Sequence, residues 1–270
     1  MIFFPPAKIN LGLRVLFKRT DGYHEIDSCM LPIPLVDVLE ILPSAHFSFQ
    51  QTGLTIPGDF NDNLCVKAYQ LMKDKFSVPP VYIHLRKEIP MGAGLGGGSS
   101  DAAYVLSGLN DLFDLNCTTV QLEDFAAQLG SDCPFFIQNI PQIAKGRGEQ
   151  LSDCDVSLKN YFLKIINPGI HIGTKEAYNG IVLCSDAPKV KTIVEGPIEN
   201  WKDQLVNDFE RSVFTQHPAL ESLKANLYNE GAIYAAMSGS GSTMFGIFSE
   251  EPLLTFQKET SYLEKVVKFI

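Results

Sequence analysis

A glycine-rich run between Pro90 and Ala103 contains the first residues that could do chemistry. Five glycines fall within positions 92–98, and Ser99 and Ser100 follow directly. Glycine lets the backbone adopt left-handed conformations and approach a ligand without a Cβ in the way. The serines begin an expected helix, whose N-terminus presents free N–H groups and partial positive charge. We therefore expect this run to hold the phosphates of a nucleotide, because a plain turn needs only one or two glycines.

Three known phosphate-binding loops are similar to parts of this run. The G-x-G-x-x-G spacing over 92–97 matches the dinucleotide-binding fingerprint, but a second helix, not a strand, is expected after the helix over 99–113. A P-loop has lysine directly before Ser/Thr, whereas Gly98 precedes Ser99 here. The glycine loop of protein kinases joins two strands, and this one opens a helix. The run by itself indicates phosphate binding without deciding the fold.

Two isolated charged residues, Lys8 and Asp132, could supply acid–base and electrostatic chemistry. Lys8 belongs to a segment in which apolar and polar side chains alternate, which predicts a half-buried strand. Lys8 and Asn10 then leave this strand on the face opposite the core. Asp132 lies in the stretch 130–136, just after a predicted helix end and beside a bulky apolar run. Taken singly, Lys8 could be a solvated surface lysine and Asp132 a turn former.

Periodicity and capping residues indicate the elements that position these side chains. The stretch Asn61–Asn63 can cap a helix that runs to about Phe76, and Thr118 with Gln121 fits a capping box for a helix that ends at Gly130. Strands and helices without strict alternation predict an α+β fold. The other expected elements are strands near 38–42, 46–49, 81–85 and 161–166, a strand–glycine turn–strand unit over 233–249, helices over 99–113, 174–178, 200–214 and 219–229, and a helix and closing strand in the last twenty residues.

Bulk composition argues against several classes of function. The 270 residues are 45% hydrophobic and 20% charged, with a net charge of −9 at pH 7. An acidic chain without a dense Lys/Arg cluster is not expected to bind nucleic acid. No apolar run is long enough to span a bilayer, so we expect a cytoplasmic protein without membrane contacts. Six scattered cysteines with no C-x-x-C pair predict free thiols rather than disulfides or a zinc site.

Four motifs occur in the order found in the GHMP kinases, and the chain resembles this family over its whole length. A further segment, Arg-Thr-Asp-Gly-Tyr-His at 19–24, resembles members that act on a cytidine-diphosphate-linked methylerythritol in the non-mevalonate isoprenoid pathway. The resemblance is strongest in the first 150 residues and loose between 185 and 230. The four motifs are Pro-Ala-Lys-Ile-Asn-Leu at 6–11, the glycine–serine run at 90–103, Gly-Ser-Asp-Cys-Pro-Phe at 130–135 and Gly-Ser-Gly-Ser at 239–242.

This resemblance implies a two-domain GHMP kinase fold of the α+β class. An N-terminal domain like the second domain of ribosomal protein S5 would span residues 1–152, and a ferredoxin-like C-terminal domain would span 153–270. It also implies an ATP-dependent small-molecule kinase, with Mg²⁺ entering together with ATP and no protein ligand assigned to the ion. The γ-phosphate would pass to the 2-hydroxyl of the cytidine-linked substrate, giving the 2-phosphate and ADP.

The resemblance also assigns roles to residues that match the family's motifs. Asp132 would accept or orient the hydroxyl proton, and Lys8 would pair with it and stabilise the transferring phosphoryl group. The substrate would be bound by Asn10, by Tyr23 stacked on cytosine, by His24 at the edge of the base and by Tyr178 on the opposite side. ATP would be bound by Pro90, Met91, Gly92, Ala93, Gly94, Leu95, Gly96, Gly97, Gly98, Ser99 and Ser100, with Asn63 and Lys87 at the adenosine part.

Three further positions and several other interpretations stay open. Lys145 and Arg147 could contact substrate phosphates or form a solvated turn, and Asp101 stands where relatives often carry Asn. The alternatives are another GHMP kinase (for homoserine, mevalonate or a sugar), a nucleotide-binding regulator without catalysis, and a dinucleotide-binding oxidoreductase. The expected partner is a small cytidine-diphosphate-linked molecule rather than nucleic acid or membrane, and the expected state is a monomer or weak homodimer.

Overall fold

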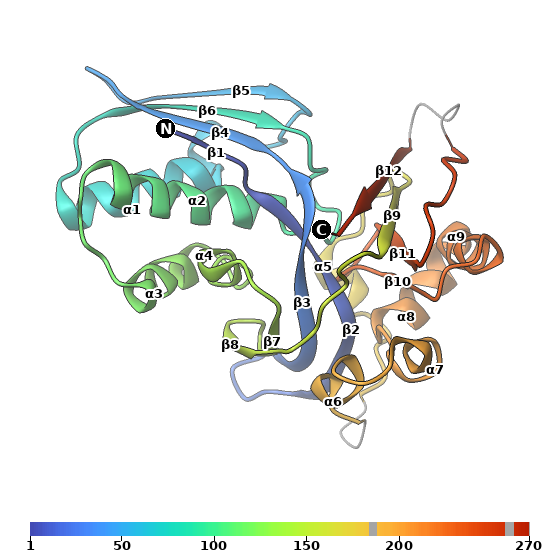
Figure 1. The fold of residues 1–270 in the computed structure, drawn as a ribbon. Helices are drawn as coiled ribbons and strands as arrows, with labels where there is room; N and C mark the ends of the chain where they lie inside the picture. Colours follow the sequence, from blue (N-terminus) through green and yellow to red (C-terminus); the bar gives the residue numbers. More distant parts are fainter. Residues whose placement is uncertain (184–187, 257–261, 270) are drawn as a thin grey trace. The chain divides into compact units, whose positions relative to one another are not determined.

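The chain, described by a computed structural model over residues 1–183, 188–256 and 262–269, divides into two compact units (Figure 1). Unit 1 comprises Met1–Lys8, Leu35–Met91 and Gly96–Ile140. Unit 2 comprises Ile9–Pro34, Gly92–Leu95 and Pro141–Ile270. The chain crosses between the units several times, so the units are not two consecutive stretches of sequence. The family domain boundary at 152 and 153 stays a prediction.

Unit 1 contains a sheet with the strand order β1-β4-β6-β5, and α1 and α2 lie along one of its faces (Figure 1). β4 is antiparallel to β1 and β6, whereas β5 is parallel to β6. The strands are β1 (Ile2–Phe3), β4 (Val38–Pro43), β5 (Ser48–Gly53) and β6 (Val81–Lys87). The helices are η1 (Phe60–Asp62), α1 (Leu64–Phe76), α2 (Gly97–Leu112), α3 (Thr119–Leu129) and α4 (Phe135–Gln138).

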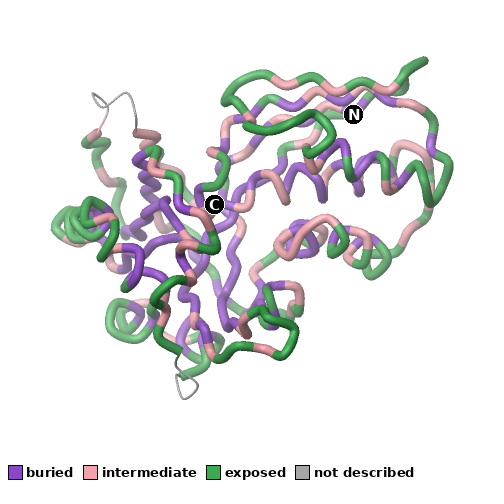
Figure 2. Tube along the Cα trace, turned by 180° about the vertical axis from the view of Figure 1, so that it is seen from behind, coloured by how far each residue is buried: buried purple, intermediate pink, exposed green. Residues whose placement is uncertain are grey.

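The helix ends in unit 1 follow local capping rules. Asn63 Oδ1 accepts a hydrogen bond from the backbone N–H of Cys65, and Thr118 with Gln121 forms the predicted capping box. Gly130 ends α3, also as predicted. The inner side of α1 is buried and its outer side is exposed, whereas α2 is buried or half-buried along nearly its whole length (Figure 2). The core between sheet and helices includes Leu39, Ile41, Tyr69, Met72, Ile83, Leu85, Val105, Leu106 and Leu109.

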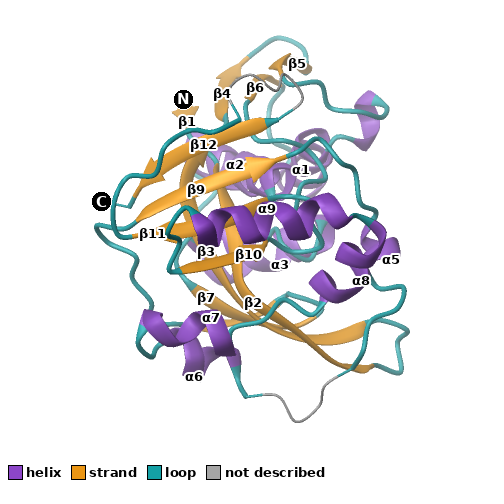
Figure 3. Ribbon diagram, turned by 90° about the vertical axis from the view of Figure 1, so that its right-hand side faces the viewer, coloured by secondary structure: helices purple, strands orange, loops and turns teal. Residues whose placement is uncertain are grey.

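Unit 2 contains most of a sheet with the strand order β2-β3-β7-β8. It also contains a sheet with the order β10-β11-β9-β12, and α9 covers one face of this second sheet (Figure 3). In the latter, neighbouring strands are antiparallel. The strands are β2 (Pro6–Lys18), β3 (His24–Val36), β7 (Gln142–Gly146), β8 (Gln150–Asp153), β9 (Phe162–Asn167), β10 (Tyr234–Met237), β11 (Met244–Phe248) and β12 (Leu263–Lys268). The helices are α5 (Thr174–Ala177), α6 (Val190–Val194), η2 (Ile198–Asn200), α7 (Trp201–Gln204), α8 (Phe209–Gln216) and α9 (Pro218–Asn229).

The first long strand, β2, differs from its prediction in burial. The alternating pattern predicts one buried face, but every residue from Pro6 to Leu13 is buried, including Lys8 and Asn10. The polar face meets other polar groups instead of water. Lys8 forms an ion pair with Asp132, and Asn10 donates a hydrogen bond to the hydroxyl of Ser28. The alternating pattern therefore identified the two faces of β2 correctly, but the prediction that the polar face is exposed was wrong.

The prediction of one continuous helix over 200–214 was also wrong, because α7 and α8 are separated at 205–208. In this break the backbone pairs with β2: Leu13 N–H donates to Val206 O, and Asp208 N–H donates to Leu13 O. Asn207 Oδ1 then accepts from the N–H of Phe209, the first residue of α8. Backbone groups that bond to a strand cannot also continue a helix, so the helix stops.

Most other predicted elements are present with small shifts. The strands near 38–42, 81–85 and 161–166, the helix over 219–229 and the strand–turn–strand unit over 233–249 are confirmed. α2 begins at Gly97 rather than Ser99, β5 begins at Ser48, and α5 ends at Ala177. Of the predicted C-terminal helix, residues 251–256 are not helical, and the rest falls on 257–261, outside the described residues; the closing strand is confirmed as β12. Sequence reasoning missed β1, β3, β7, β8, α4, α6 and the short helices η1 and η2.

Two general expectations can also be compared with the described residues. Over these residues, none of the helices has the length and apolar character needed to cross a membrane. The five cysteines at positions 29, 65, 117, 133 and 154 are free thiols, and Cys184 lies outside the described residues.

Candidate active site

In unit 1, the N-terminus of α2 lies against the side chain of Lys8. Gly96 caps this helix in the left-handed conformation with φ of 69°. A Cβ on Gly96 would lie 2.9 Å from the ring of Phe136 and 3.2 Å from Cγ of Lys8. Glycine is therefore required here both for the backbone conformation and for the close approach of Lys8. This packing places a lysine stem beside the helix N-terminus that was predicted to bind phosphates.

Lys8 and Asp132 form an ion pair in unit 1, with Lys8 Nζ 3.5 Å from Asp132 Oδ2. The Lys8 side chain is 4% exposed, and that of Asp132 is 33% exposed. The separation exceeds the roughly 2.7–2.9 Å of a tight charge-assisted hydrogen bond. Asp132 therefore keeps a partly open carboxylate beside a buried cation, an arrangement that can receive a proton from a substrate hydroxyl.

The middle of the glycine run belongs to unit 2, where the turn between β10 and β11 holds it. The hydroxyl of Ser238 donates to Gly94 O at 2.8 Å, and Thr243 N–H donates to Ala93 O at 3.3 Å. Gly94 has φ of +76°, and a Cβ there would come within 2.0 Å of Ser238 O. Gly239 in the same turn packs close to Asn10 Oδ1. The 239–242 motif, read from the sequence only as a family marker, thus supports the phosphate loop and borders Asn10.

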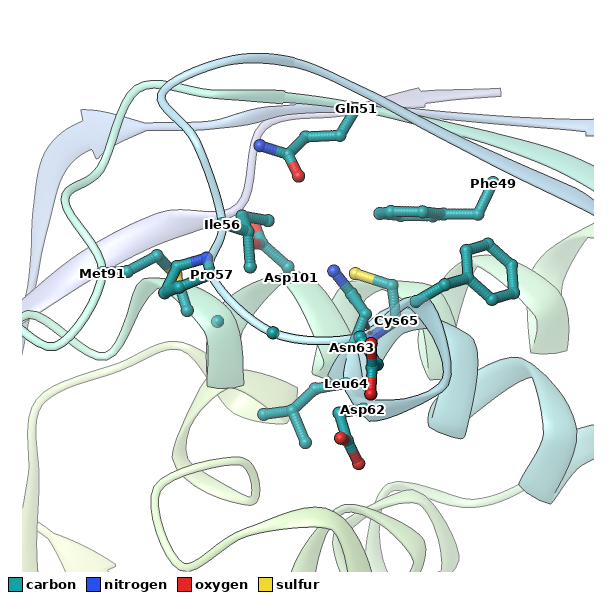
Figure 4. Close-up of a pocket in the computed structure, with 14 residues that line it drawn as sticks. Phe49, Gln51, Ile56, Pro57, Asp62, Asn63, Leu64, Cys65, Met91 and Asp101 are labelled. Carbon is teal, nitrogen blue, oxygen red and sulfur yellow. Dashed lines mark hydrogen bonds between the residues drawn. The ribbon is translucent and has the colours of Figure 1, made fainter.

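A pocket of about 350 Å³ opens in unit 1 between the glycine run and the start of α1 (Figure 4). Its volume is within the range of small-ligand sites. Three predicted nucleotide contacts line it: Asn63, Met91 and Gly98. Apolar walls come from Phe49 in β5 and Phe60 in η1, whose rings meet edge to face at 6.1 Å between centroids. The other lining residues are Gln51, Ile56, Pro57, Gly58, Asp59, Asp62, Leu64, Cys65 and Asp101.

Lys87, predicted to contact adenosine, lies beside this pocket without lining it. Its ammonium group is fully buried and donates to carboxylates of Asp37 and Asp101, the latter at 2.8 Å. A Cβ on Gly97 would lie 2.8 Å from Lys87 Nζ, so the cation sits directly under the first turn of α2. Burial raises the pKa of Asp101 to about 8, although the nearby Lys87 charge opposes this shift. Contact between Lys87 and adenosine stays a prediction.

The residues expected to recognise cytidine gather in unit 2. The His24 and Tyr178 rings stack at 4.5 Å between centroids with 15° between their planes. Tyr23 is 54% exposed, and the guanidinium of Arg147 lies 4.8 Å from the centre of its ring. Burial, with a smaller contribution from the Lys18 charge, lowers the pKa of His24. His24 is therefore a neutral imidazole at pH 7, able to donate from one ring nitrogen and accept at the other.

Each unit thus brings together a distinct part of the predicted set. Unit 1 joins Lys8, Asp132, the start of α2 and the pocket with Asn63. Unit 2 joins Asn10 to the loop at 92–95, and it places His24 against Tyr178 rather than leaving the two rings apart. Sequence reasoning missed Asp37, Phe49 and Phe60. Asp37 belongs to no motif, and the two phenylalanines could be read only as ordinary core residues.

Comparison with known proteins identifies the family of the chain. The model of the GHMP kinases N terminal domain matches residues 63–139, and that of the GHMP kinases C terminal matches residues 190–259. The 4-diphosphocytidyl-2-C-methyl-D-erythritol kinase of Cytophaga hutchinsonii is 50% identical over 268 residues, covering 99% of both chains. The protein of the same name from Bacteroides fragilis is 49% identical and covers 94% of both chains.

Solved structures support the same fold. A crystal structure of 4-(cytidine 5'-diphospho)-2C-methyl-D-erythritol kinase superposes with a TM-score of 0.80 at 33% identity, covering 92% of this chain and 90% of that one. The mevalonate kinase of Methanococcus jannaschii has a TM-score of 0.69 at 12% identity, covering 99% of this chain and 96% of that one, and shows the fold alone. The predicted α+β GHMP kinase fold is confirmed. With half of its residues shared over nearly its full length, the chain belongs to the 4-diphosphocytidyl-2-C-methyl-D-erythritol kinases, a branch of the GHMP kinases.

Proposed function

We propose that this kinase transfers the γ-phosphate of ATP to the 2-hydroxyl of 4-(cytidine 5'-diphospho)-2-C-methyl-D-erythritol. The products are the 2-phosphate and ADP, and the reaction belongs to isoprenoid precursor biosynthesis. The bond between the γ-phosphorus and the β,γ-bridging oxygen breaks while the substrate oxygen bonds to the γ-phosphorus. The observation that carries the proposal is the Lys8–Asp132 pair packed against Gly96 at the N-terminus of α2.

ATP binding divides between the pocket and the helix start in unit 1. The adenosine part fits the pocket between Phe49, Phe60 and Met91, with Asn63 at its edge. The phosphates then lie over the first turn of α2, where backbone N–H groups point outward and the helix dipole favours negative charge. The left-handed glycines of the run leave the space that phosphate oxygens need. This gives an acidic chain a local anion site without a basic surface.

The chemical step uses Lys8 and Asp132. Asp132 takes the proton of the attacking 2-hydroxyl or orients that hydroxyl, and its partly open carboxylate is accessible for this. Lys8 Nζ, next to the helix N-terminus, neutralises charge on the transferring phosphoryl group. Phosphoryl transfer depends mainly on positioning and charge, so two placed side chains and a helix start are a sufficient set.

Mg²⁺ enters with ATP in this proposal. Among the described residues, no group of three His, Cys, Asp or Glu side chains could hold a metal ion. Mg²⁺ is commonly bound by substrate phosphates and water with few protein ligands. When bound, the ion neutralises phosphate charge; the chain's own contribution is the backbone cradle and Lys8.

The acceptor's cytosine is recognised in unit 2. The exposed ring of Tyr23 stacks on the base, and neutral His24 hydrogen-bonds to its edge. Tyr178, stacked on His24, holds the imidazole plane, and Asn10 contacts the substrate beside the loop at 92–95. The partner is therefore a small cytidine-diphosphate-linked molecule.

An acceptor panel tests this function. Purified enzyme with Mg²⁺ and ATP is given the cytidine-linked methylerythritol, homoserine, mevalonate or no acceptor, and ADP release is followed. We expect ADP release with the cytidine compound alone, with phosphorus NMR showing one new phosphomonoester. ADP release that is independent of acceptor, or activity on homoserine instead, contradicts the proposal.

A further inference from the structure

One oxygen of Asp101 is buried on the wall of the unit 1 pocket with no hydrogen-bond partner among the described residues. Asp101 is 1% exposed. Its Oδ2 accepts from Lys87 at 2.8 Å, whereas Oδ1 has no partner. Leaving a buried carboxylate oxygen unpaired is costly. Because Asp101 lines the pocket (Figure 4), a ligand in the pocket can supply the missing donor.

The neighbouring carboxylate of the same cluster has no such capacity. Asp37 Oδ2 accepts from Lys87, and its Oδ1 accepts from the backbone N–H groups of Glu88 and Ile89. Asp37 is fully buried and does not line the pocket. Asp37 and Asp101 thus share Lys87, and of the two only Asp101 lines the pocket and has an oxygen without a hydrogen-bond partner.

Asn63 supplies the complementary group on the same pocket. Its Oδ1 is occupied as the N-cap of α1, accepting from Cys65 N–H at 2.9 Å. The amide Nδ2 is therefore the part of Asn63 that can serve a ligand, and it is a donor. Phe49 and Phe60 provide apolar walls suited to a flat ring. The pocket accordingly offers one acceptor, one donor and apolar faces.

Adenine presents the matching pattern, with an exocyclic amino group that donates next to a ring nitrogen that accepts. We propose that Asp101 selects the base of the nucleotide, with its Oδ1 accepting a hydrogen bond from the 6-amino group of adenine while Asn63 Nδ2 donates to the adjacent ring nitrogen. This rests on the proposed function, since it requires ATP in the pocket. Above pH 8, where Asp101 has lost its proton, a 6-oxo purine places an acceptor opposite Oδ1 and is rejected, and a purine without a 6-substituent leaves that oxygen unpaired.

Nucleotide analogues on the unaltered enzyme test this directly. Phosphorylation of the cytidine-linked acceptor is measured at pH 9, where Asp101 is ionised, with ATP, ITP and purine riboside triphosphate, which carries hydrogen at position 6. A lost hydrogen bond to a buried charged group predicts that kcat/KM falls by about 10- to 100-fold for both analogues. Equal kcat/KM for all three nucleotides overturns the inference. Failure to use ATP at all would instead overturn the proposed function.

Two matched variants distinguish recognition of the nucleotide base by Asp101 from its ion pair with Lys87. Asp101→Asn and Asp37→Asn each remove one carboxylate charge from the same lysine, but only position 101 lines the pocket. Asparagine offers both a donor and an acceptor, so Asp101→Asn should reduce the ATP/ITP ratio of kcat/KM to within about threefold. Asp37→Asn should keep the unaltered enzyme's ratio. The inference is overturned if Asp101→Asn keeps the ATP/ITP ratio of kcat/KM, or if both variants lose this ratio equally. If a variant does not fold, the comparison of nucleotide analogues on the unaltered enzyme decides alone.

Discussion

The ammonium group of Lys8 lies 3.5 Å from the carboxylate of Asp132, and the stem of Lys8 packs on Gly96 at the start of α2. A strand start, a turn after α3 and a helix N-terminus thereby meet at one point within unit 1. None of the three would suffice alone, because the helix binds phosphate without a base and the ion pair has no phosphate to act on. Their contact is what makes a kinase site out of separate motifs.

Removing either member of this pair should abolish turnover with little effect on folding. For Lys8→Ala and Asp132→Asn we expect kcat to fall by about 10²–10⁴-fold, because each removes charge that acts in the transition state. Steady-state kinetics with both substrates measures this. Lys191→Ala is the control, since Lys191 and Glu195 form an exposed ion pair of similar length, 3.6 Å. Near-normal kcat in Lys8→Ala or Asp132→Asn would remove that residue from the mechanism.

Gly96→Ala should impair catalysis through geometry alone. The new methyl would meet the Phe136 ring at 2.9 Å and Lys8 Cγ at 3.2 Å, on a backbone with φ of 69°. We expect a loss of about 1–2 kcal/mol in the free energy of unfolding from the left-handed conformation, with a drop in kcat as Lys8 is displaced. Gly231→Ala is matched to it, because Gly231 has φ of 97° and nothing within 4 Å of the added Cβ.

Urea unfolding and kcat are measured together on these two variants. Both should lose stability, and only Gly96→Ala should lose activity. Activity loss in both variants would mean that general destabilisation, and not the position of Lys8, limits turnover.

The parts of this site that the sequence could predict are those encoded by neighbours in the chain. Asn63 and the Thr118–Gln121 pair cap their helices through residues at most three positions away, so pattern reading located them. The Asp37–Lys87 contact joins residues 50 positions apart with no shared motif. Likewise, alternation in β2 separates two faces, but it does not say that Asp132 and Ser28 cover the polar one. Contacts of high sequence separation are set by the fold as a whole.

Recognition of the cytidine substrate should weaken at acidic pH. His24 has a pKa below its usual 6.5 because burial and Lys18 disfavour the charged imidazole. The neutral ring is needed to accept a hydrogen bond from the cytosine amino group, so kcat/KM for the acceptor should fall as pH drops through this lowered pKa. The Lys18 charge acts on His24, and the Tyr178 ring stacks on it. In His24→Gln, which does not titrate, the acidic decrease assigned to His24 should disappear while kcat/KM is lower throughout.

Tyr178 should act by orienting His24. For Tyr178→Ala we expect KM for the cytidine substrate to rise several-fold with kcat nearly unchanged, because the imidazole loses the ring that fixes its plane. Tyr178→Phe keeps the stacked ring and should restore KM. If Tyr178→Phe is as impaired as Tyr178→Ala, the hydroxyl and not the stack carries the effect.

The buried Asp37–Lys87–Asp101 cluster should make stability depend on pH in an unusual direction. Burial raises the pKa of Asp101 from 3.8 to about 8, so the folded protein binds a proton there that the unfolded chain releases. The free energy of unfolding should therefore decrease as pH rises from about 4 to about 8 and level off above this range. The raised pKa of Lys87 keeps it protonated throughout. Asp101→Asn removes this titration while leaving all other ionisable groups in place. Urea unfolding of the unaltered protein and of this variant is therefore compared at several pH values. The free energies of unfolding of the two proteins should converge or cross as pH rises. Parallel profiles for the two proteins would show that Asp101 does not titrate within this range.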